Sequence, residues 1–369
     1  MLRFGNKDKL MLISLLIFWI YFIGGRTAMP VILLLTFFYL FSLKYRLLPS
    51  QDKLEVLGII LAGIIIRIVF ILANPNPPID VYYLSIEGFQ NLIKGVNPYT
   101  TTYGNPQIEH LFGDPSVQSY PPLMLLLLGV GYLLSDVRFS ILMADFGIAY
   151  LIYRLFNEDE NGLLLMCIYI LNPLNVFVMR WAWNESILTV FMLASLFALN
   201  KKPSIISPIL LGLSFGIKHF SVLFAPFLWR NYDKKQIAIS ILVGILTYMP
   251  FIVISPYDMI YDMLLYFNFV RYDSKSLIPM FLKFFWKEAA DVPIVVVTLL
   301  SLIRYLVTGF LVTFFALRSK TKVDISYNFA LCFFTFLLLS PISNINYFNV
   351  LLPFIAVGAG LEEKRPHKS

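Results

Sequence analysis

Residues 54–99 read LEVLGIILAGIIIRIVFILANPNPPIDVYYLSIEGFQNLIKGVNPY, and they join a long apolar segment to a polar one. Residues 54–73 are almost all apolar, and about 20 such residues are enough for an α-helix to cross a bilayer core of roughly 30 Å. The Asn-Pro-Asn-Pro-Pro sequence that follows ends this helix, because proline cannot continue one. The chain is therefore predicted to leave the membrane here and to begin a loop.

The whole chain has the composition of an integral membrane protein. Of its 369 residues, 59% are hydrophobic and only 14% are charged, and the mean hydropathy is +0.76. Soluble domains carry about 25% charged residues, so a soluble globular protein, a disordered chain and a nucleic-acid-binding module are excluded. The net charge of +7 is then explained by Lys and Arg in cytoplasmic loops, and no nucleic-acid partner is expected.

Apolar runs recur along the sequence, and they predict an all-α integral membrane fold with about 12 transmembrane helices. The run 121–134 is not counted, because counting it would place the later basic clusters on the wrong side under the positive-inside rule. It is interpreted as a re-entrant or interfacial segment. The predicted spans are 10–24, 28–44, 54–73, 138–156, 161–179, 186–200, 203–217, 219–230, 236–254, 293–317, 325–341 and 345–361.

The positive-inside rule also predicts the orientation of this multi-pass protein. Basic clusters at 201–202 and 318–322 fall on the same side as both termini, and this side is predicted to be cytoplasmic. Two long loops, about 74–137 and about 255–292, then lie outside, so chemistry is expected on the extracytoplasmic face. The expected organisation is two extra N-terminal transmembrane helices in 1–53, a membrane core in 54–361 and a cytoplasmic tail in 362–369.

A helix is predicted directly after the prolines of the first loop. Asp80 stands at the expected N-cap position, and Gly95 is suited to the residue after the C-cap. Tyr82, Phe89 and Ile93 recur with helical spacing and form an apolar face. The helix is therefore expected to lie flat in the membrane interface and to hold Asp80 at the membrane surface.

Several short motifs occur in a fixed order along the chain. A span containing Arg67 is followed by D-x-x-Y at 80–83, G-x-N-P-Y at 95–99 and Y-P-P at 120–122. The W-N-E sequence at 183–185 and an Asn-Tyr pair at 346–347 come later. In this order and spacing, roughly residues 54–361 resemble the GT-C superfamily of polytopic glycosyltransferases, and within it glycosyltransferase family 87.

The resemblance implies an enzyme that transfers a hexose, with mannose the first candidate, from a polyprenyl or dolichyl phosphate carrier. The acceptor would be a lipid-linked or protein-linked glycan, and the anomeric centre would be inverted. Asp80 would be the general base, since an acceptor hydroxyl must lose its proton as it attacks. Glu87 is the alternative base or an acceptor contact.

The departing phosphate needs positive charge or oriented donors. The second outer loop interleaves aromatic residues with Arg and Lys, which suits a docking groove for a polyprenyl phosphate as well as an ordinary interfacial belt. The candidate substrate-binding residues are Lys218, His219, Arg271, Arg180, Glu185, Tyr83, Tyr120, Asn346 and Tyr347. His110, His219 and His367 are far apart in sequence and predict no metal site. No cofactor is expected, and a divalent metal requirement stays open.

Plainer roles remain open for the charged residues. Asp80 can be a simple helix cap, Glu185 a carboxylate favoured at a helix start, and Lys218 a helix-end anchor. Arg67 and Asp145 are charged residues inside predicted spans, and the favoured interpretation is a structural ion pair between packed helices. Arg304 is interpreted in the same way.

Two other functions fit the span count. One is a polysaccharide polymerase or ligase that uses a lipid diphosphate. Such enzymes usually have an arginine-rich outer loop, whereas the first loop here has only Lys94 and is otherwise acidic. The other is a flippase or transporter of lipid-linked sugars, which predicts two matching halves with broken helices. No such halves are evident in the sequence.

Overall fold

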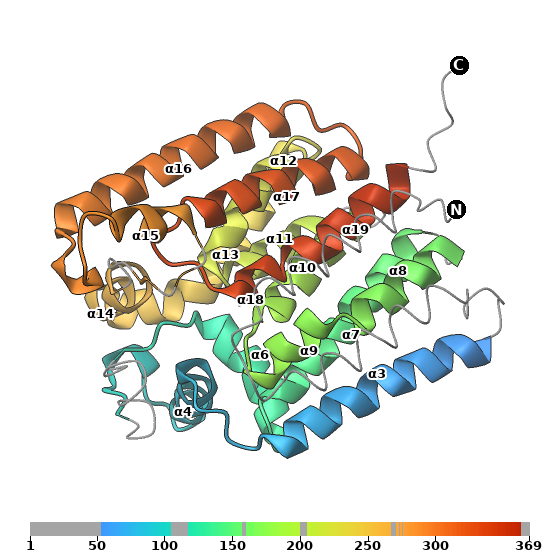
Figure 1. Ribbon diagram of the computed structural model, residues 1–369, viewed down its shortest axis with the longest axis horizontal. Helices are drawn as coiled ribbons and strands as arrows, with labels where there is room; N and C mark the ends of the chain where they lie inside the picture. Colours follow the sequence, from blue (N-terminus) through green and yellow to red (C-terminus); the bar gives the residue numbers. More distant parts are fainter. Residues whose placement is uncertain are drawn as a thin grey trace.

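The computed structural model describes residues 53–104, 117–156, 160–199, 205–266, 271–272, 274 and 276–362. Every regular element in these ranges is helical, which confirms the all-α prediction for them (Figure 1). The two predicted N-terminal spans and the tail after Glu362 lie outside the described residues. The elements are α3 (Lys53–Ala73), α4 (Asp80–Ile93), η1 (Pro98–Thr100), α6 (Pro122–Leu133), α7 (Arg138–Leu155), α8 (Glu160–Ile170), α9 (Pro173–Arg180), α10 (Glu185–Ala198), α11 (Ile206–Phe215), η2 (His219–Phe224), α12 (Ala225–Trp229), α13 (Lys234–Ile254), α14 (Pro256–Ile260), η3 (Tyr261–Leu265), α15 (Leu277–Leu282), η4 (Ala289–Asp291), α16 (Ile294–Ala316), α17 (Lys322–Leu338), α18 (Ile345–Phe348) and α19 (Leu351–Glu362).

Two of the described helices, α13 and α16, are long and apolar enough to cross a membrane alone. The number rises to four if each of two bent pairs, α6 with α7 and α8 with α9, is one span. Further apolar helices are shorter, so the total of about 12 spans stays a prediction. The axes of α6 and α7 meet at 105°, as in a broken span or a re-entrant segment, so the interpretation of 121–134 as re-entrant or interfacial stays a prediction.

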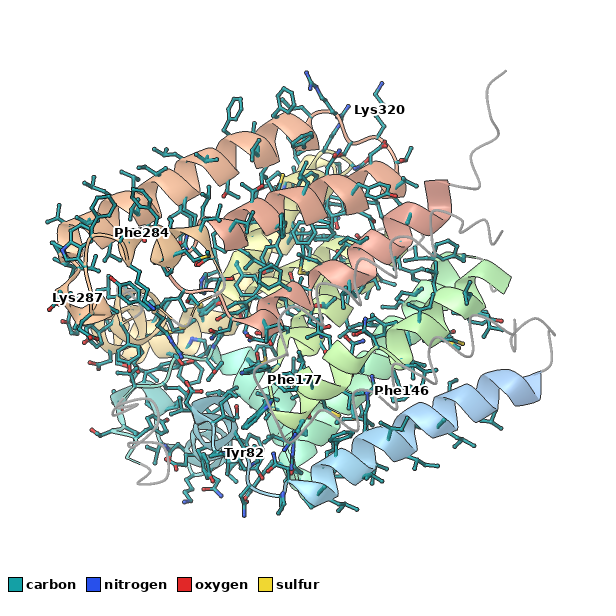
Figure 2. The ribbon with its side chains drawn as sticks, viewed as in Figure 1. Tyr82, Phe146, Phe177, Phe284, Lys287 and Lys320 are labelled. Atoms are coloured by element: carbon teal, nitrogen blue, oxygen red, sulfur yellow. The ribbon has the colours of Figure 1, made fainter. Side chains whose placement is uncertain are left out.

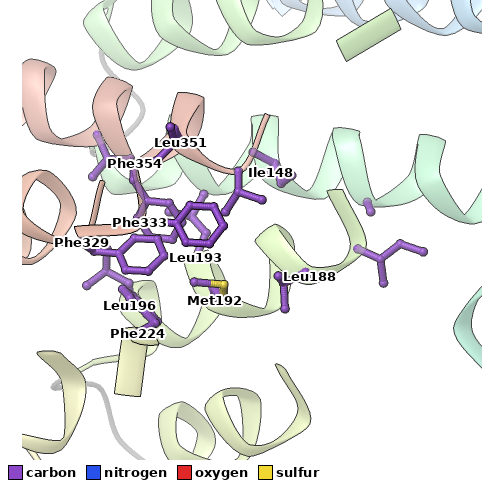
Figure 3. Packing of buried hydrophobic residues seen from close by; sticks show 14 of the residues in the cluster. Ile148, Leu188, Met192, Leu193, Leu196, Phe224, Phe329, Phe333, Leu351 and Phe354 are labelled. Atoms are coloured by element: carbon purple, nitrogen blue, oxygen red, sulfur yellow. The ribbon is translucent and has the colours of Figure 1, made fainter. Parts of the chain in front are cut away.

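Aromatic side chains from distant parts of the sequence form the centre of the core. Phe329 in α17 contacts both Phe224 and Phe354, with ring centroids 4.8 and 4.7 Å away, and the rings of Phe224 and Phe354 lie 5.2 Å apart (Figure 3). Met192 and Leu193 of α10 are fully buried beside them. Edge-to-face contacts at these spacings add to the energy of burial. This packing holds η2 in place and, with it, the chain that precedes η2.

The helix α4 forms where the sequence predicted it. Its C-terminal end is as expected, but its N-terminal end differs from the prediction. Gly95 follows the C-cap with a φ of +72°, a left-handed conformation that glycine adopts without strain, as expected. The N-cap, however, is Ile79, and Asp80 is the first helical residue. Asp80 still satisfies a helix-start donor, because its Oδ1 accepts a hydrogen bond from Val81 N–H at 2.8 Å.

The apolar face of α4 packs against protein. Tyr82 and Phe89 are buried, and Phe89 lies so close to Gly129 of α6 that a side chain at Gly129 would collide with its ring. Ile93, predicted on the same face, is 62% exposed. The expectation that the whole face lies flat on the membrane was therefore too simple, because α6 covers most of it.

A buried ion pair fixes the chain at the start of α4. Arg138 Nη2 lies 2.6 Å from Asp136 Oδ2, and it also donates to the carbonyl of Ile71 at the end of α3. Tyr82 donates its hydroxyl hydrogen to Pro75 O at 3.0 Å and lies under the Arg138 guanidinium. The ends of α3, α4 and α7 are thus joined at one point, close to Asp80.

The two loops predicted to share one side of the membrane pack against each other. Asn97 Nδ2 donates to Ser255 Oγ at 2.6 Å, and Gln118 N–H donates to Asp262 Oδ2 at 2.9 Å. Tyr99 is buried against Met259 and nearby residues of the second segment. Figure 1 accordingly shows α4, α14 and α15 at one end of the long helices, on the left of the view.

Two lysines assigned to opposite sides of the membrane, Lys287 and Lys320, lie far apart in the molecule. Figure 2 shows Lys287 and Phe284 beside α15, whereas Lys320 lies beyond the far end of α16. The orientation of the termini themselves stays a prediction, because it depends on the positive-inside rule.

Candidate active site

A cavity of about 690 Å³ opens where the two segments predicted to lie outside the membrane meet the helix bundle. The start of α4, residues 119–121, the N-terminus of α10, the chain before η2, and parts of η3, α16, α17 and α18 form its wall. Eight of the predicted site residues line this cavity: Asp80, Tyr120, Glu185, Lys218, His219, Arg271, Asn346 and Tyr347. Residues spread over more than half of the sequence therefore meet around a space large enough for a sugar-bearing headgroup.

Asp80 is held by the helix that begins with it, and its environment changes its acidity. Burial raises its pKa above the usual 3.8, while the Val81 N–H and the positive charges of Arg271 and Lys218 oppose the increase. A carboxylate with a raised pKa is a stronger base than an exposed one, provided that it is ionised. The two cations favour the ionised form.

Lys218 forms a buried ion pair with Glu185. Glu185 is fully buried at the start of α10 and bonds through Oε1 to Lys218 Nζ. The Lys218 Nζ also lies 5.3 Å from the centre of the Tyr347 ring. The charge of Lys218 is therefore largely balanced within the protein, and neither residue is the solvated or snorkelling group that the plainer interpretation described.

Tyr120 lies close to both carboxylates of the cavity. Burial raises its pKa well above 10.0, and the negative charges of Asp80 and Glu185 raise it further. Its hydroxyl therefore stays protonated and can act as a hydrogen-bond donor at physiological pH. The backbone carbonyl of Tyr120 accepts the Tyr99 hydroxyl at 2.8 Å, which links the Y-P-P motif to the G-x-N-P-Y motif.

Arg67 and Asp145 make the structural contact that the sequence favoured. Arg67 Nε lies 3.1 Å from Asp145 Oδ2, both side chains are buried, and neither lines the cavity. Arg67 also donates to the carbonyl of Ile170, so it joins α3, α7 and α8. This pair belongs to the packing of the bundle.

Arg304 does not behave in the same way, and its place in the site was missed. It projects from α16 into the cavity wall, where Nη1 donates to Ser340 Oγ at 2.7 Å. The guanidinium lies 4.5 Å from the ring centres of both Tyr305 and Phe336. Within the described residues Arg304 forms no ion pair. A lone arginine in the predicted span 293–317 was the available signal for a binding role.

Several polar atoms in the cavity wall have no hydrogen-bond partner among the described residues. They are both amide atoms of Asn184, Oε2 of Glu185, Oδ1 of Asn346 and Nε of Arg304. A buried polar group without a partner costs about 1–3 kcal/mol. Asn184 was not predicted as a site residue, and only its place within W-N-E could have indicated it.

Three predicted site residues lie away from the cavity wall. Arg180, at the end of α9, stacks 5.6 Å from the Trp181 ring. Tyr83 packs edge-on against Tyr82, and the charge of Glu87 acts on Tyr103 in the same loop. Within the described ranges, no three His, Cys, Asp or Glu side chains lie close enough together to hold a metal ion.

The fold and the cavity together define a membrane protein in which an apolar helical bundle encloses a polar, charged site. Residues 118–341, more than half of the chain, match the model of glycosyltransferase family 87. The chain belongs to glycosyltransferase family 87, and it is therefore an enzyme that uses a sugar donor and an acceptor. Searches of curated proteins and of solved structures gave no match. The matched stretch excludes Asp80 and Asn346, so the family assignment is independent of their roles.

Proposed function

We propose that the enzyme transfers a hexose from a polyprenyl phosphate carrier to a lipid-linked or protein-linked glycan on the extracytoplasmic face, with inversion. Mannose is the first candidate sugar. The observation that carries the proposal is that one cavity holds a partly buried carboxylate, Asp80, together with the two arginines Arg271 and Arg304. A base and an anion-binding group on a shared wall are the two elements that a direct displacement requires.

In the proposed reaction, Asp80 accepts the proton of the acceptor hydroxyl as its oxygen attacks the anomeric carbon. The bond from that carbon to the carrier phosphate breaks on the opposite side, and the configuration inverts. The raised pKa of Asp80 brings its basicity nearer to working pH, which increases the driving force for proton transfer.

Arg271 and Arg304 would stabilise the negative charge on the departing phosphate. Arg304 suits a monophosphate on a lipid, because it lies in an apolar helix and its guanidinium is flanked by aromatic rings. Met263, Leu265 and Leu337 supply apolar wall nearby for the first isoprene units. Lys218 was expected to hold the phosphate, and in this proposal it contributes less, because Glu185 already balances its charge.

The second outer segment was predicted to form a docking groove for the polyprenyl phosphate, and in this arrangement only part of the segment contributes to the donor site. Arg271 lines the cavity, but Lys283 and Lys287 are not among its lining residues. Phe284 and Phe285 are 86% and 64% exposed, and Figure 2 shows Phe284 on the left of the view, on the same side as Lys287. These side chains suit contact with membrane lipid at the interface.

The donor class is tested with the purified full chain in detergent. The enzyme is given radiolabelled decaprenyl-phosphate mannose, glucose or galactose and a membrane glycolipid extract, and transferred sugar is counted. We expect transfer from at least one monophosphate donor. Transfer from decaprenyl-diphosphate sugars or nucleotide sugars alone would refute the proposed donor and leave the family assignment unaffected.

A further inference from the structure

The cavity wall also holds a group of uncharged and acidic polar side chains, separate from its arginines. Asn184 and Glu185 enter it from the start of α10, and Asn346 enters it from α18. The two segments are neighbours, because Trp183 and Ile345 pack in the same apolar cluster. All three polar side chains are at least 95% buried. We call these three residues the amide–carboxylate corner.

The corner offers hydrogen-bonding groups that the described protein leaves unpartnered. Asn184 offers an N–H donor and a carbonyl acceptor, Glu185 offers Oε2, and Asn346 offers Oδ1. Lys218 holds the other oxygen of Glu185 and fixes the direction of the carboxylate. Acceptors therefore outnumber donors, and the matching ligand must bring mostly O–H donors.

The charge of the corner decides between possible ligands. The Glu185 carboxylate repels a phosphate. In the proposed function, the phosphate binds instead to the arginines elsewhere on the cavity wall. A cation is disfavoured, because Lys218 supplies the positive charge next to Glu185. Neutral hydroxyl groups remain, and each can donate to a carboxylate or amide oxygen while accepting from an amide N–H.

Aromatic rings next to the corner favour the same ligand. Phe177 and Trp183 line the cavity with their ring centres 5.7 Å apart, and Tyr347 follows Asn346 in α18. A pyranose ring has an apolar face of C–H groups, which packs well on aromatic side chains. Burial also rules out another role for this stretch, since Asn184 is only 1% exposed and its N-E-S sequon cannot be reached by a modifying enzyme.

We infer that Asn184, Glu185 and Asn346 form a subsite that binds neighbouring hydroxyl groups of a hexopyranose and selects which hexose enters the cavity. The inference rests on the proposed function for the identity of the carrier, but the hydroxyl-binding subsite itself does not require that carrier. The hexose belongs to the donor or to the acceptor glycan, and both present the same hydroxyl chemistry.

The test measures binding to the purified full chain in detergent by calorimetry. The probes are decaprenyl phosphate, its mannose, glucose and galactose esters, and octyl glycosides of the same three hexoses. The quantity of interest is the gain in affinity that the sugar adds to the bare lipid phosphate. Asn184→Leu and Asn346→Leu keep the side-chain size and remove the amide, and each should weaken the sugar-dependent binding roughly tenfold. Affinity for bare decaprenyl phosphate should stay unchanged.

Asn349→Leu is the matched control. Asn349 is equally buried and has an unpartnered Oδ1, but it does not line the cavity, so its variant should bind every probe like the wild type. Where a leucine variant does not fold, Asn184→Ser and Asn346→Ser replace it, since serine keeps polarity but shortens the reach.

Each outcome is decisive. Weaker binding of the decaprenyl-phosphate hexoses supports the subsite and assigns it to the donor, and weaker binding of the octyl glycosides alone supports it and assigns it to the acceptor. The inference is overturned if the variants change neither, or if no hexose adds affinity to either class of probe. Failure of bare decaprenyl phosphate to bind counts against the proposed carrier only, because the octyl glycosides still test the subsite.

Discussion

Asp80→Asn removes the proposed base and alters little else. The hydrogen bond from Val81 N–H to Oδ1 can be kept by the asparagine oxygen. The lost charge at the helix start costs about 0.3–1 kcal/mol, and burial, which disfavours that charge, offsets part of this. The free energy of unfolding should therefore change by less than about 1 kcal/mol.

The effect on rate should be far larger. Loss of a general base lowers kcat by about 10²–10⁴-fold, which corresponds to roughly 3–5 kcal/mol of transition-state stabilisation. The assay is transfer from a decaprenyl-phosphate hexose, with donor KM measured alongside and expected to be nearly unchanged. Asp80→Ala should lose the same activity. Its stability should fall by less than the loss of a helix cap would cause, because Ile79 is the N-cap.

Glu87→Gln is the matched control, since it makes the same change of charge on the same helix and Glu87 does not line the cavity. It should keep near-normal turnover. The pH profile is a second control. The base acts only when ionised, and the pKa of Asp80 is raised, so wild-type kcat/KM should fall with decreasing pH at a pH above 3.8. Turnover near the wild-type level in Asp80→Asn would refute the assignment, and an inactive Glu87→Gln with an active Asp80→Asn would transfer the role to Glu87.

The remaining predictions concern charge and topology. Arg304→Gln should raise donor KM about tenfold or more and leave acceptor KM unchanged, and equal effects on both would contradict a phosphate role. Lys218→Ala should lower the free energy of unfolding by about 3–5 kcal/mol, because it leaves Glu185 buried and unpaired, and the double variant with Glu185→Gln should recover much of that loss in denaturation experiments. If the Lys218 variant is instead as stable as the wild type but uses donor poorly, the lysine binds phosphate directly. A reporter fused after Ser369 should be cytoplasmic, and a cysteine at Asn105 should react with an impermeant label from outside; labelling only after permeabilisation would reverse the assigned side.

The sequence predicted the elements whose signals are local. The helix after the prolines begins one residue earlier than expected from an Asp80 cap, and Gly95 follows its C-cap as predicted. Part of the cavity wall could also be anticipated, because the order of the motifs indicated residues such as Tyr120 and Glu185.

What could not be predicted depends on neighbours far away in sequence. The burial of α4 against α6 depends on the fit of Phe89 to Gly129, which periodicity does not encode. Arg67 and Arg304 carry the same local signal, an arginine in an apolar helix. They differ only because an aspartate lies opposite the first, whereas Ser340 and two aromatic rings surround the second.

The hydrogen bonds from Asn97 to Ser255 and from Gln118 to Asp262 set a condition for engineering within the family. A chimera that exchanges residues 255–292 for those of a relative would separate both pairs. Gln118 stands two residues before Tyr120, so a mismatch there would displace the cavity wall as well as the transplanted segment. An exchange of residues 255–292 should therefore transfer donor specificity only when residues 97 and 118 are exchanged as well.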